Sequence, residues 1–236
     1  NAAGYTNVDA CETAKEECFA VNAEAVKNIA QACRDGNIPL IHYSTDYVFD
    51  GNTNHPYTEE DPCNPINTYG ASKLAGEHHL RRLTDNFILI RTAWLYGAKG
   101  KNFISAILER ARETGRLTVV DDQMGSPTCT RDLAAATELL VDKNARGIFH
   151  VTNRGCCTWY DFARKILKEA RLDQVELSPI KTGELQRAAR RPAYSVLDMH
   201  KFVAATGKTM QPWQLAFSDY YAFITSRTCL SPPGAA

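Results

Sequence analysis

Two residues suited to proton transfer lie one helical turn apart in this sequence. Tyr69 and Lys73 are separated by four positions in a stretch with the pattern of a helix from about Thr68 to Leu83, so both side chains emerge on the same face. A nearby ammonium favours the phenolate and brings the pKa of a tyrosine below its usual value of about 10. The pair therefore predicts that Tyr69 is a general acid for a carbonyl oxygen and that Lys73 lowers its pKa.

Hydroxyl groups end the element that precedes this helix. The run IPLIHYST is short and apolar and finishes in polar residues, which is typical of a buried parallel strand. Ligands of open α/β sheets bind at the carboxyl ends of such strands, so Ser44 or Thr45 could hydrogen-bond the reacting oxygen. On pattern alone the alternative is that Ser44 and Thr45 end a strand and that Tyr69 and Lys73 are an exposed helix pair.

Helices and strands alternate on both sides of these residues. Helices are predicted over residues 12–35, 68–83, 102–114 and 131–143, from Thr158 and after Pro212, and strands over 38–45, 87–94, 117–120 and 147–152. This alternation predicts an α/β fold with a parallel sheet. After Gln123 the pattern changes to that of a smaller mixed α/β region, in which Thr158 and Asp161 have capping-box spacing.

Composition favours a globular enzyme that acts on a small molecule. The 236 residues are 44% hydrophobic, and 27 Lys+Arg balance 27 Asp+Glu, so no basic stripe indicates a nucleic-acid or membrane partner. No apolar stretch approaches the roughly 20 residues of a membrane span, and no signal-peptide pattern is present. We expect a cytoplasmic protein whose eight cysteines are mostly reduced and structural.

Seven segments carry a resemblance to a known family. They are NAAGYTNVD, STDYVFDG, PINTYGASKLAGE, RTAWLYG, VVDDQMGSPT, TWYDFA and RPAYSVLD, and the likeness runs in order from Asn1 to about Leu215. Together they resemble the dTDP-4-dehydrorhamnose reductase (RmlD-like) branch of the extended short-chain dehydrogenase/reductases. The resemblance implies hydride transfer from NADPH or NADH to C4 of dTDP-4-dehydro-L-rhamnose. The product, dTDP-L-rhamnose, would serve polysaccharide biosynthesis.

The same resemblance implies a set of site residues. The catalytic residues would be Thr45, Tyr69 and Lys73, and Lys73 would also bond the nicotinamide ribose. Besides Tyr69 and Lys73, the cofactor would be lined by Ala3, Gly4, Tyr5, Thr6 and Tyr43, and the sugar nucleotide would contact Thr45, Asp46, Tyr47 and Trp94. Gly4 stands where the family more usually has alanine, a departure that should loosen the contact without removing it.

Several residues keep two interpretations. Trp94 could offer an apolar face to the deoxysugar ring or be a core aromatic at the end of a strand. Arg187, Arg190 and Arg191 could approach the diphosphate with bidentate hydrogen bonds or form a solvated charge run. Asn22 lies where the wider superfamily keeps a helix asparagine near the active site, and a buried hydrogen bond is its alternative role.

The Gly-rich turn and helix that would hold the cofactor pyrophosphate do not occur in this chain. By comparison with the family, the chain resembles a protein lacking roughly 60 residues at its front. We therefore expect a partial Rossmann dinucleotide-binding domain, without its first strands, over residues 1–123. A mainly substrate-binding region over 124–228 and a disordered tail over 229–236 would follow. We also expect the chain to be inactive by itself and its preference for NAD or NADP to be unreadable.

Two other functions stay open at this point. A non-catalytic binding subunit would resemble the regulatory subunit of methionine adenosyltransferase, but the intact set of Thr45, Tyr69 and Lys73 favours an enzyme. A sugar-nucleotide epimerase or dehydratase is the second. A dehydratase would place acidic residues directly after the strand threonine, whereas here Asp46 is followed by Tyr47. The family resemblance also allows Mg²⁺ and a homodimer, although no carboxylate cluster for the metal is evident.

Overall fold

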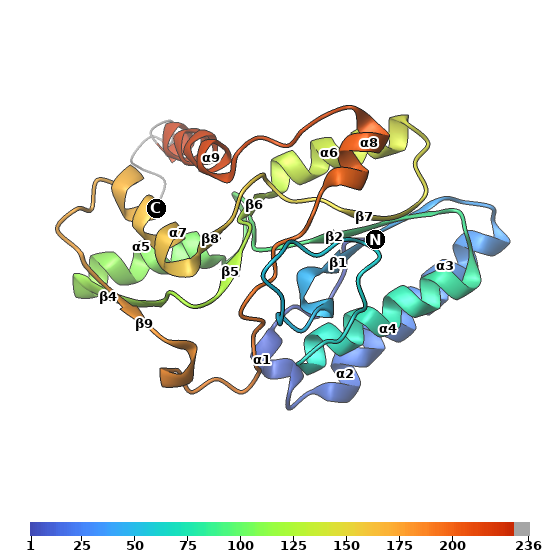
Figure 1. Ribbon diagram of the computed structural model, residues 1–236, viewed down its shortest axis with the longest axis horizontal. Coiled ribbons are helices and arrows are strands. Elements are labelled where there is room, and N and C mark those ends of the chain that lie inside the picture. Colours follow the sequence, from blue (N-terminus) through green and yellow to red (C-terminus); the bar gives the residue numbers. More distant parts are fainter. Residues whose placement is uncertain (229–236) are drawn as a thin grey trace, which may run out of the picture.

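A three-stranded parallel sheet with helices on both faces forms one half of the molecule (Figure 1). The computed structural model describes residues 1–228. The strands lie in the order β1 (Leu40–Thr45), β2 (Phe87–Thr92), β7 (Gly147–His150). One face is covered by α3 (Ala25–Asp35) and α4 (Thr68–Leu83), the other by α6 (Thr130–Asp142) and α8 (His200–Thr206). The predicted Rossmann-like α/β class is confirmed.

The central strand explains this arrangement. Every residue of β2 is buried, as expected of a strand with a layer on each face. Because side chains alternate along a strand, Leu89 packs with α3 and α4. Ile88 and Ile90 pack with α6 and α8. Each buried side chain of this size contributes about 1.5–3 kcal/mol relative to leaving it in water.

The other half of the molecule is built around a separate aromatic-rich core. Its helices are α5 (Phe103–Thr114), α7 (Trp159–Glu169) and α9 (Trp213–Thr228). Beside them β4 (Arg116–Val120) pairs in parallel with β9 (Glu176–Ile180). The strand predicted over 117–120 was expected to belong to the main sheet, and that expectation is wrong. Its apolar residues Leu117 and Val119 pack into the second core instead.

Neither half corresponds to one continuous stretch of chain. β7 and α6 follow position 123 yet complete the first sheet, whereas α5 and β4 precede it yet belong to the second core. The assignment of substrate binding mainly to residues 124–228 stays a prediction. The tail expected over 229–236 lies outside the described residues, as does Cys229, and the seven described cysteines are free thiols.

Short elements connect these layers. They are α1 (Val8–Cys11), α2 (Lys15–Phe19), the π-helix η1 (Ala20–Glu24), the 3₁₀ turns η2 (Asp46–Val48) and η3 (Thr182–Glu184), and the two-residue strands β3 (Leu95–Tyr96), β5 (Met124–Gly125), β6 (Thr128–Cys129) and β8 (Cys157–Thr158). β3 pairs with β6, and β5 pairs with β8.

The helix predicted over 12–35 is interrupted at its centre. A π turn carrying the buried Asn22 separates α2 from α3, and Phe19, the last residue of α2, is 37% exposed. Other predicted boundaries are confirmed. Asn102 caps α5 and Gly115 ends it in the left-handed region, while Thr158 and Asp161 form the predicted capping box of α7.

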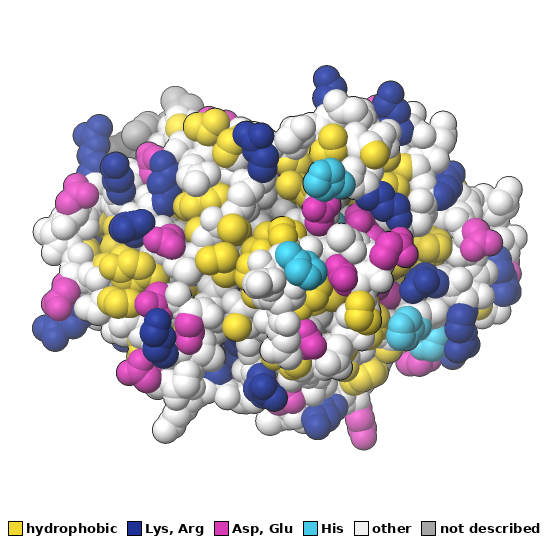
Figure 2. Space-filling model, viewed as in Figure 1, with side chains coloured by type: hydrophobic (Ala, Val, Ile, Leu, Met, Phe, Trp, Pro, Cys, Tyr) yellow, Lys and Arg dark blue, Asp and Glu magenta, His cyan; other side chains and the backbone are white. Residues whose placement is uncertain are grey.

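Basic and acidic side chains are interspersed on the face shown in Figure 2, around a central band of apolar side chains. The part of that face made by described residues therefore has no continuous basic patch. Among the described residues no helix has the length and hydropathy needed to cross a membrane.

Candidate active site

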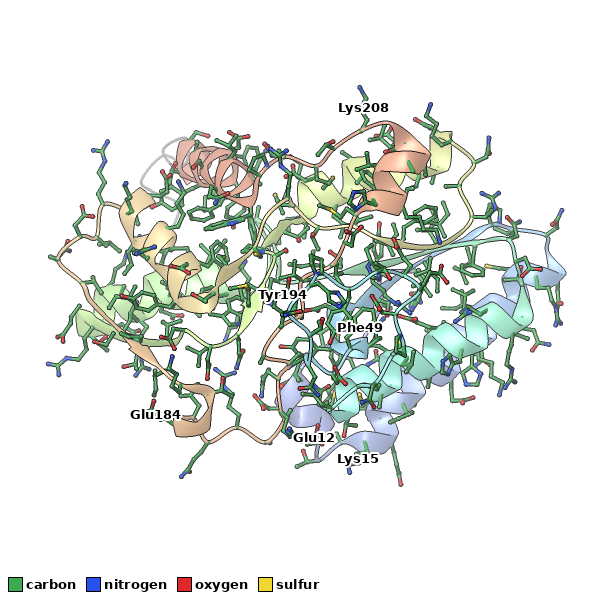
Figure 3. The ribbon with its side chains drawn as sticks, viewed as in Figure 1. Glu12, Lys15, Phe49, Glu184, Tyr194 and Lys208 are labelled. Atoms are coloured by element: carbon green, nitrogen blue, oxygen red, sulfur yellow. The ribbon has the colours of Figure 1, made fainter. Side chains whose placement is uncertain are left out.

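The first turn of α4, which carries Tyr69, is fixed from three directions. The N-cap Asn67 accepts a hydrogen bond from the Gly70 amide (2.7 Å), and its own amide donates to the Arg190 carbonyl (2.8 Å). The Glu12 carboxylate accepts bonds from the Thr68 amide (2.8 Å) and hydroxyl (2.7 Å). Figure 3 labels Glu12 beside α1, below the start of α4. Capping of this kind leaves Tyr69 little freedom to move.

Gly70 allows the helix to approach the end of β1 closely. A Cβ at this position would lie 2.1 Å from the Tyr47 carbonyl oxygen, a separation that no side chain tolerates. The contact brings the two tyrosine rings together edge to face, with centroids 5.9 Å apart at 78°. Tyr69 therefore lies against η2, the turn that continues β1.

Thr45, the last residue of β1, joins the same group. Its hydroxyl oxygen accepts a bond from the Tyr47 amide (3.1 Å) and donates to the Asp46 carboxylate (3.1 Å). Burial raises the pKa of Tyr69 above its usual value, while a hydrogen bond with Thr45 acts in the opposite direction. The structure thus brings Thr45 and Tyr69 together, as the sequence predicted for the carboxyl end of this strand.

Lys73 lies one turn further along α4 and is buried. Its ammonium donates to the Tyr43 carbonyl oxygen of β1 (2.6 Å) and lies 3.4 Å from His42 Nε2. Burial lowers the pKa of Lys73 to about 8, and the nearby Glu77 opposes that change. The predicted lowering of the Tyr69 pKa by Lys73 is not seen here: burial raises that pKa, and the opposing contribution comes from the hydrogen bond with Thr45.

His42 is a neighbour of Lys73 that sequence reasoning missed. Its side chain is buried, and burial, followed by the charge of Lys73, lowers its pKa to about 3. The imidazole is therefore neutral near pH 7. The alternation along β1 could have located it, since His42 and Ser44 both face α4.

A buried ion pair supports this face of the sheet. Arg91 Nη2 and Glu77 Oε2 are 2.7 Å apart, with 2% and 0% of their side chains exposed. Ser44 donates to the same Glu77 carboxylate (2.5 Å), so Ser44 is turned away from Thr45 and toward the helix. Arg91 also lies 3.4 Å from His150 Nε2. A charged residue inside the apolar run FILIRT was the sequence signal that a buried partner must exist.

The predicted cofactor segment is held by Asn22. Its side-chain oxygen accepts from the Tyr5 amide (2.8 Å), and its amide donates to the Tyr5 carbonyl (3.0 Å) and to Ser72 (3.0 Å). Ala3, Gly4 and Thr6 are exposed on either side. Asn22 therefore makes the buried hydrogen bonds of its alternative role, while tying this segment to the helix that carries Tyr69.

Two details of this segment qualify the sequence expectations. An alanine Cβ at Gly4 would lie 3.3 Å from Asn22 Oδ1, so the family's more usual residue would fit with a small adjustment. Tyr43 presents its backbone carbonyl to Lys73, whereas its hydroxyl bonds Thr137 of α6 (3.0 Å). The backbone of Tyr43 therefore lies beside Lys73, and its ring does not.

Asp46 has the properties of a group that receives a ligand. It is buried, which raises its pKa to about 6, and its Oδ2 atom has no hydrogen-bond partner among the described residues. An unpaired buried carboxylate oxygen is costly, and a substrate hydroxyl would satisfy it. Asp46 and Tyr47 thus lie beside Thr45 and Tyr69, where the resemblance put the substrate.

Trp94 lies apart from this group, beyond the end of β2. Its ring stacks on Trp159, with centroids 3.5 Å apart at 6°, and both rings are half-buried. The partner covers one face of the indole, so a sugar would meet the remaining surface of the ring. The contact places Trp94 at the junction between β2 and the second core.

The three arginines have different surroundings. Arg191 makes two ion-pair contacts with Asp9, at 2.6 and 2.7 Å, which lower the pKa of the Asp9 carboxyl to about 2. Its charge is therefore already balanced. Arg187 is exposed and 4.0 Å from the same carboxylate, and Arg190 is exposed. Diphosphate binding stays a prediction for Arg187 and Arg190 and loses support for Arg191.

No group of three or more His, Cys, Asp or Glu side chains within the described residues could hold a metal ion. The expectation of Mg²⁺ thus gains no support from the donor atoms that the fold brings together.

The chain is similar to proteins of known name over most of its length. The spore coat polysaccharide biosynthesis protein SpsK of Bacillus subtilis is 40% identical over 220 residues, 93% of this chain and 77% of SpsK. The dTDP-4-dehydrorhamnose reductase of Escherichia coli is 37% identical over 225 residues, 91% of this chain and 75% of that protein.

Solved structures agree with these sequence matches. A dTDP-4-dehydrorhamnose reductase from Clostridium acetobutylicum superposes with a TM-score of 0.91 at 38% identity, covering 94% of this chain and 79% of that one. The Bacillus anthracis dTDP-4-dehydrorhamnose reductase in complex with NADP gives 0.91 at 35% identity, covering 94% and 78%. The model of the RmlD substrate binding domain matches residues 1–225. The chain therefore belongs to the RmlD substrate binding domain family.

Proposed function

We propose that this chain contains the catalytic residues and the substrate-binding part of a reductase that converts dTDP-4-dehydro-L-rhamnose to dTDP-L-rhamnose with NADPH. The observation that carries the proposal is the group at the end of β1. There Thr45 bonds Tyr69, Tyr47 lies against its ring, and Lys73 follows one turn later. Relatives that match over most of the chain are named dTDP-4-dehydrorhamnose reductase, and one is a complex with NADP.

Each residue in this group has a role in the reaction. The bound nicotinamide supplies the hydride that reaches C4. Tyr69 donates its proton to the carbonyl oxygen, and its raised pKa keeps it protonated until that transfer. Thr45 hydrogen-bonds the same oxygen and holds the carbonyl against Tyr69. The unpaired Oδ2 of Asp46 accepts a hydroxyl of the sugar.

The residues that would hold the cofactor have side chains of a suitable chemical type and size. Lys73, whose ammonium donates to the Tyr43 carbonyl, would also donate to the ribose hydroxyls. The exposed residues Ala3, Gly4 and Thr6 offer small side chains beside the fixed backbone of Tyr5. NADPH is chosen over NADH because the relative with a bound cofactor holds NADP. We also propose that the protein is cytoplasmic and forms a homodimer. Size-exclusion chromatography tests the homodimer.

The test is a turnover assay on the full-length protein that contains this chain. Purified protein is mixed with NADPH and either dTDP-4-dehydro-L-rhamnose or dTDP-4-dehydro-6-deoxy-D-glucose, and the product is identified by NMR. We expect dTDP-L-rhamnose and a kcat/KM for the first substrate at least tenfold above that for the second. Binding of the sugar nucleotide without any NADPH oxidation would instead favour the non-catalytic binding subunit.

A further inference from the structure

The backbone of Trp94 adopts a conformation that its residue type disfavours. Its φ angle is 48°, in the left-handed region where a bulky side chain is an outlier. The residue follows β2 and Ala93, and its carbonyl oxygen accepts a bond from the Thr128 amide (3.2 Å). Such strain persists only where surrounding contacts fix the residue.

Trp159 supplies the first of those contacts. The two indole planes are parallel to within 6° and their centroids are 3.5 Å apart. Trp159 is itself held in place, because it is the first residue of α7 and lies between Thr158 and Asp161, which form the capping box of that helix. The ring of Phe103 packs on it from α5, at 4.5 Å between centroids. The partner of Trp94 is therefore rigid.

Gly125 supplies the second contact. A Cβ built at this position would lie 2.4 Å from Trp94 Cε2 and 2.6 Å from Nε1, so only glycine leaves room for the indole where it stands. Gly125 pairs with Cys157 across the β5–β8 ladder, and Cys157 lies two residues before Trp159. One small sheet thus sets the positions of both neighbours of Trp94.

The stacked tryptophan pair is only partly enclosed by the second core. Trp94 and Trp159 both remain half-buried, although each packs against the second core. A ring that is held against a partner and still reaches solvent can meet a ligand without losing rotamer freedom on binding.

We propose that Trp159 and Gly125 are positioning residues that hold the Trp94 indole for the sugar ring of the substrate. The inference rests on the proposed function and on the expectation from the sequence that Trp94 contacts the sugar nucleotide. Trp159 acts through Trp94 and not by touching the substrate. Its loss should therefore affect the sugar and leave the nucleotide and the cofactor bound as before.

Four variants of the full-length protein test this: Trp159→Ala, Trp159→Phe, Trp94→Ala and the double variant Trp159→Ala/Trp94→Ala. We expect Trp159→Ala to raise the KM for dTDP-4-dehydro-L-rhamnose about tenfold, equivalent to about 1.4 kcal/mol. The KM for NADPH and the inhibition constant of free dTDP should change less than about twofold. Trp159→Phe keeps an aromatic partner and should recover most of the loss. The double variant should match Trp94→Ala, because the two effects pass through one ring.

Near-ultraviolet circular dichroism reports the stack independently of activity, since parallel indoles in contact couple. The coupled signal should be present in the wild type and absent from Trp159→Ala. Gly125→Ala should keep both tryptophans yet raise the same KM by displacing the indole.

The possible failures are distinguishable. If the wild-type protein reduces no dTDP-sugar, the proposed function is contradicted, and so is this inference. If the wild-type protein reduces dTDP-4-dehydro-L-rhamnose but Trp159→Ala has an unchanged KM for it, only this inference is contradicted. Equal losses for sugar, dTDP and NADPH would identify Trp159 as a residue needed only for folding and would also overturn it.

Discussion

Lys73 changes its protonation state close to neutral pH. Its pKa is lowered from 10.5 to about 8 by burial, so the ammonium begins to lose its proton just above pH 7. Tyr69 has a pKa above its usual value and stays protonated over the same range. The two groups thus titrate in an order opposite to the one expected from an isolated Tyr/Lys pair, because both are shielded from water.

This order predicts the alkaline side of the pH profile. Turnover of the full-length protein should fall as the pH rises through about 8, when Lys73 becomes neutral and its bond to the cofactor ribose weakens. The free energy of unfolding should instead increase as the pH rises from about 8 to 10.5. Between pH 8 and 10.5 the unfolded chain binds the proton that the folded chain has lost, so deprotonation favours the folded state.

The measurement is kcat from about pH 6 to pH 10, with unfolding by urea at the same pH values. If the bound ribose raises the pKa of Lys73, the alkaline decrease in kcat should occur at a higher pH than the alkaline decrease in kcat/KM. A kcat/KM that is flat to about pH 10 would show that the charge of Lys73 has no part in the reaction.

At the scale of elements, α4 depends on two close approaches. Gly70 admits the Tyr47 carbonyl at the start of the helix, and Gly76 admits the Asn22 carbonyl, which would lie 2.2 Å from an added Cβ. Directly after Gly76, Glu77 anchors the helix to Arg91 of β2. The position of the catalytic face is therefore set by contacts on both sides of the helix.

Gly70→Ala tests the first approach. The added methyl should displace Tyr69 from Thr45, lower kcat at least tenfold and cost about 1–3 kcal/mol of unfolding free energy, as overpacking does. Gly183→Ala is the matched control, because no atom lies within 4 Å of its added Cβ and its φ is not left-handed. Wild-type kcat in Gly70→Ala would show that the helix can shift without moving the site.

The buried pair of Glu77 and Arg91 gives a second prediction at this scale. Glu77→Gln should cost about 3–5 kcal/mol in urea unfolding, since it leaves a buried guanidinium without its partner. Asp161 and Arg164 form the comparison pair at the surface, with 38% and 69% exposed. Arg164→Ala should cost less than about 1 kcal/mol. Equal losses for the two variants would contradict the role given to burial.

For the whole molecule, two buried neutral histidines, on the outer strands β1 and β7 of the sheet, predict its response to acid. Burial lowers the pKa of His42 and of His150 to about 3, from 6.5. Because these values lie below that of the unfolded chain, the stabilisation is present above pH 6.5 and is lost as the pH falls toward 3.

Each histidine should remove about 1.4 kcal/mol of stability per pH unit in that window. Urea unfolding of the wild type and of His150→Gln, from about pH 7 to pH 4, measures the slope. The variant should be less stable than the wild type near pH 7 and have the shallower slope, because it lacks the penalty of protonating a buried imidazole. An unchanged slope would show that groups other than His150 cause the pH dependence.

Much of this architecture could be predicted from the sequence, because local signals determine it. Hydrophobic periodicity located the strands of the parallel sheet, and cap residues such as Asn102 and Thr158 fixed helix ends. Contacts between distant segments could not be predicted. Nothing local distinguishes β4 as a strand of a separate sheet, or Trp159 as the partner of Trp94. Spacing placed Lys73 beside Tyr69, but its bond to the Tyr43 carbonyl depends on the packing of α4 on β1.

The most direct test of the account is the proton donor itself. Tyr69→Phe in the full-length protein removes one oxygen atom and keeps the ring against Tyr47. We expect kcat for dTDP-4-dehydro-L-rhamnose to fall at least about 10²-fold, with the dissociation constant for NADPH nearly unchanged by calorimetry. Tyr221→Phe, on α9 within the second core's rim, is the matched control and should keep wild-type turnover. Turnover by Tyr69→Phe within about twofold of the wild type would contradict the assignment of Tyr69 as the general acid.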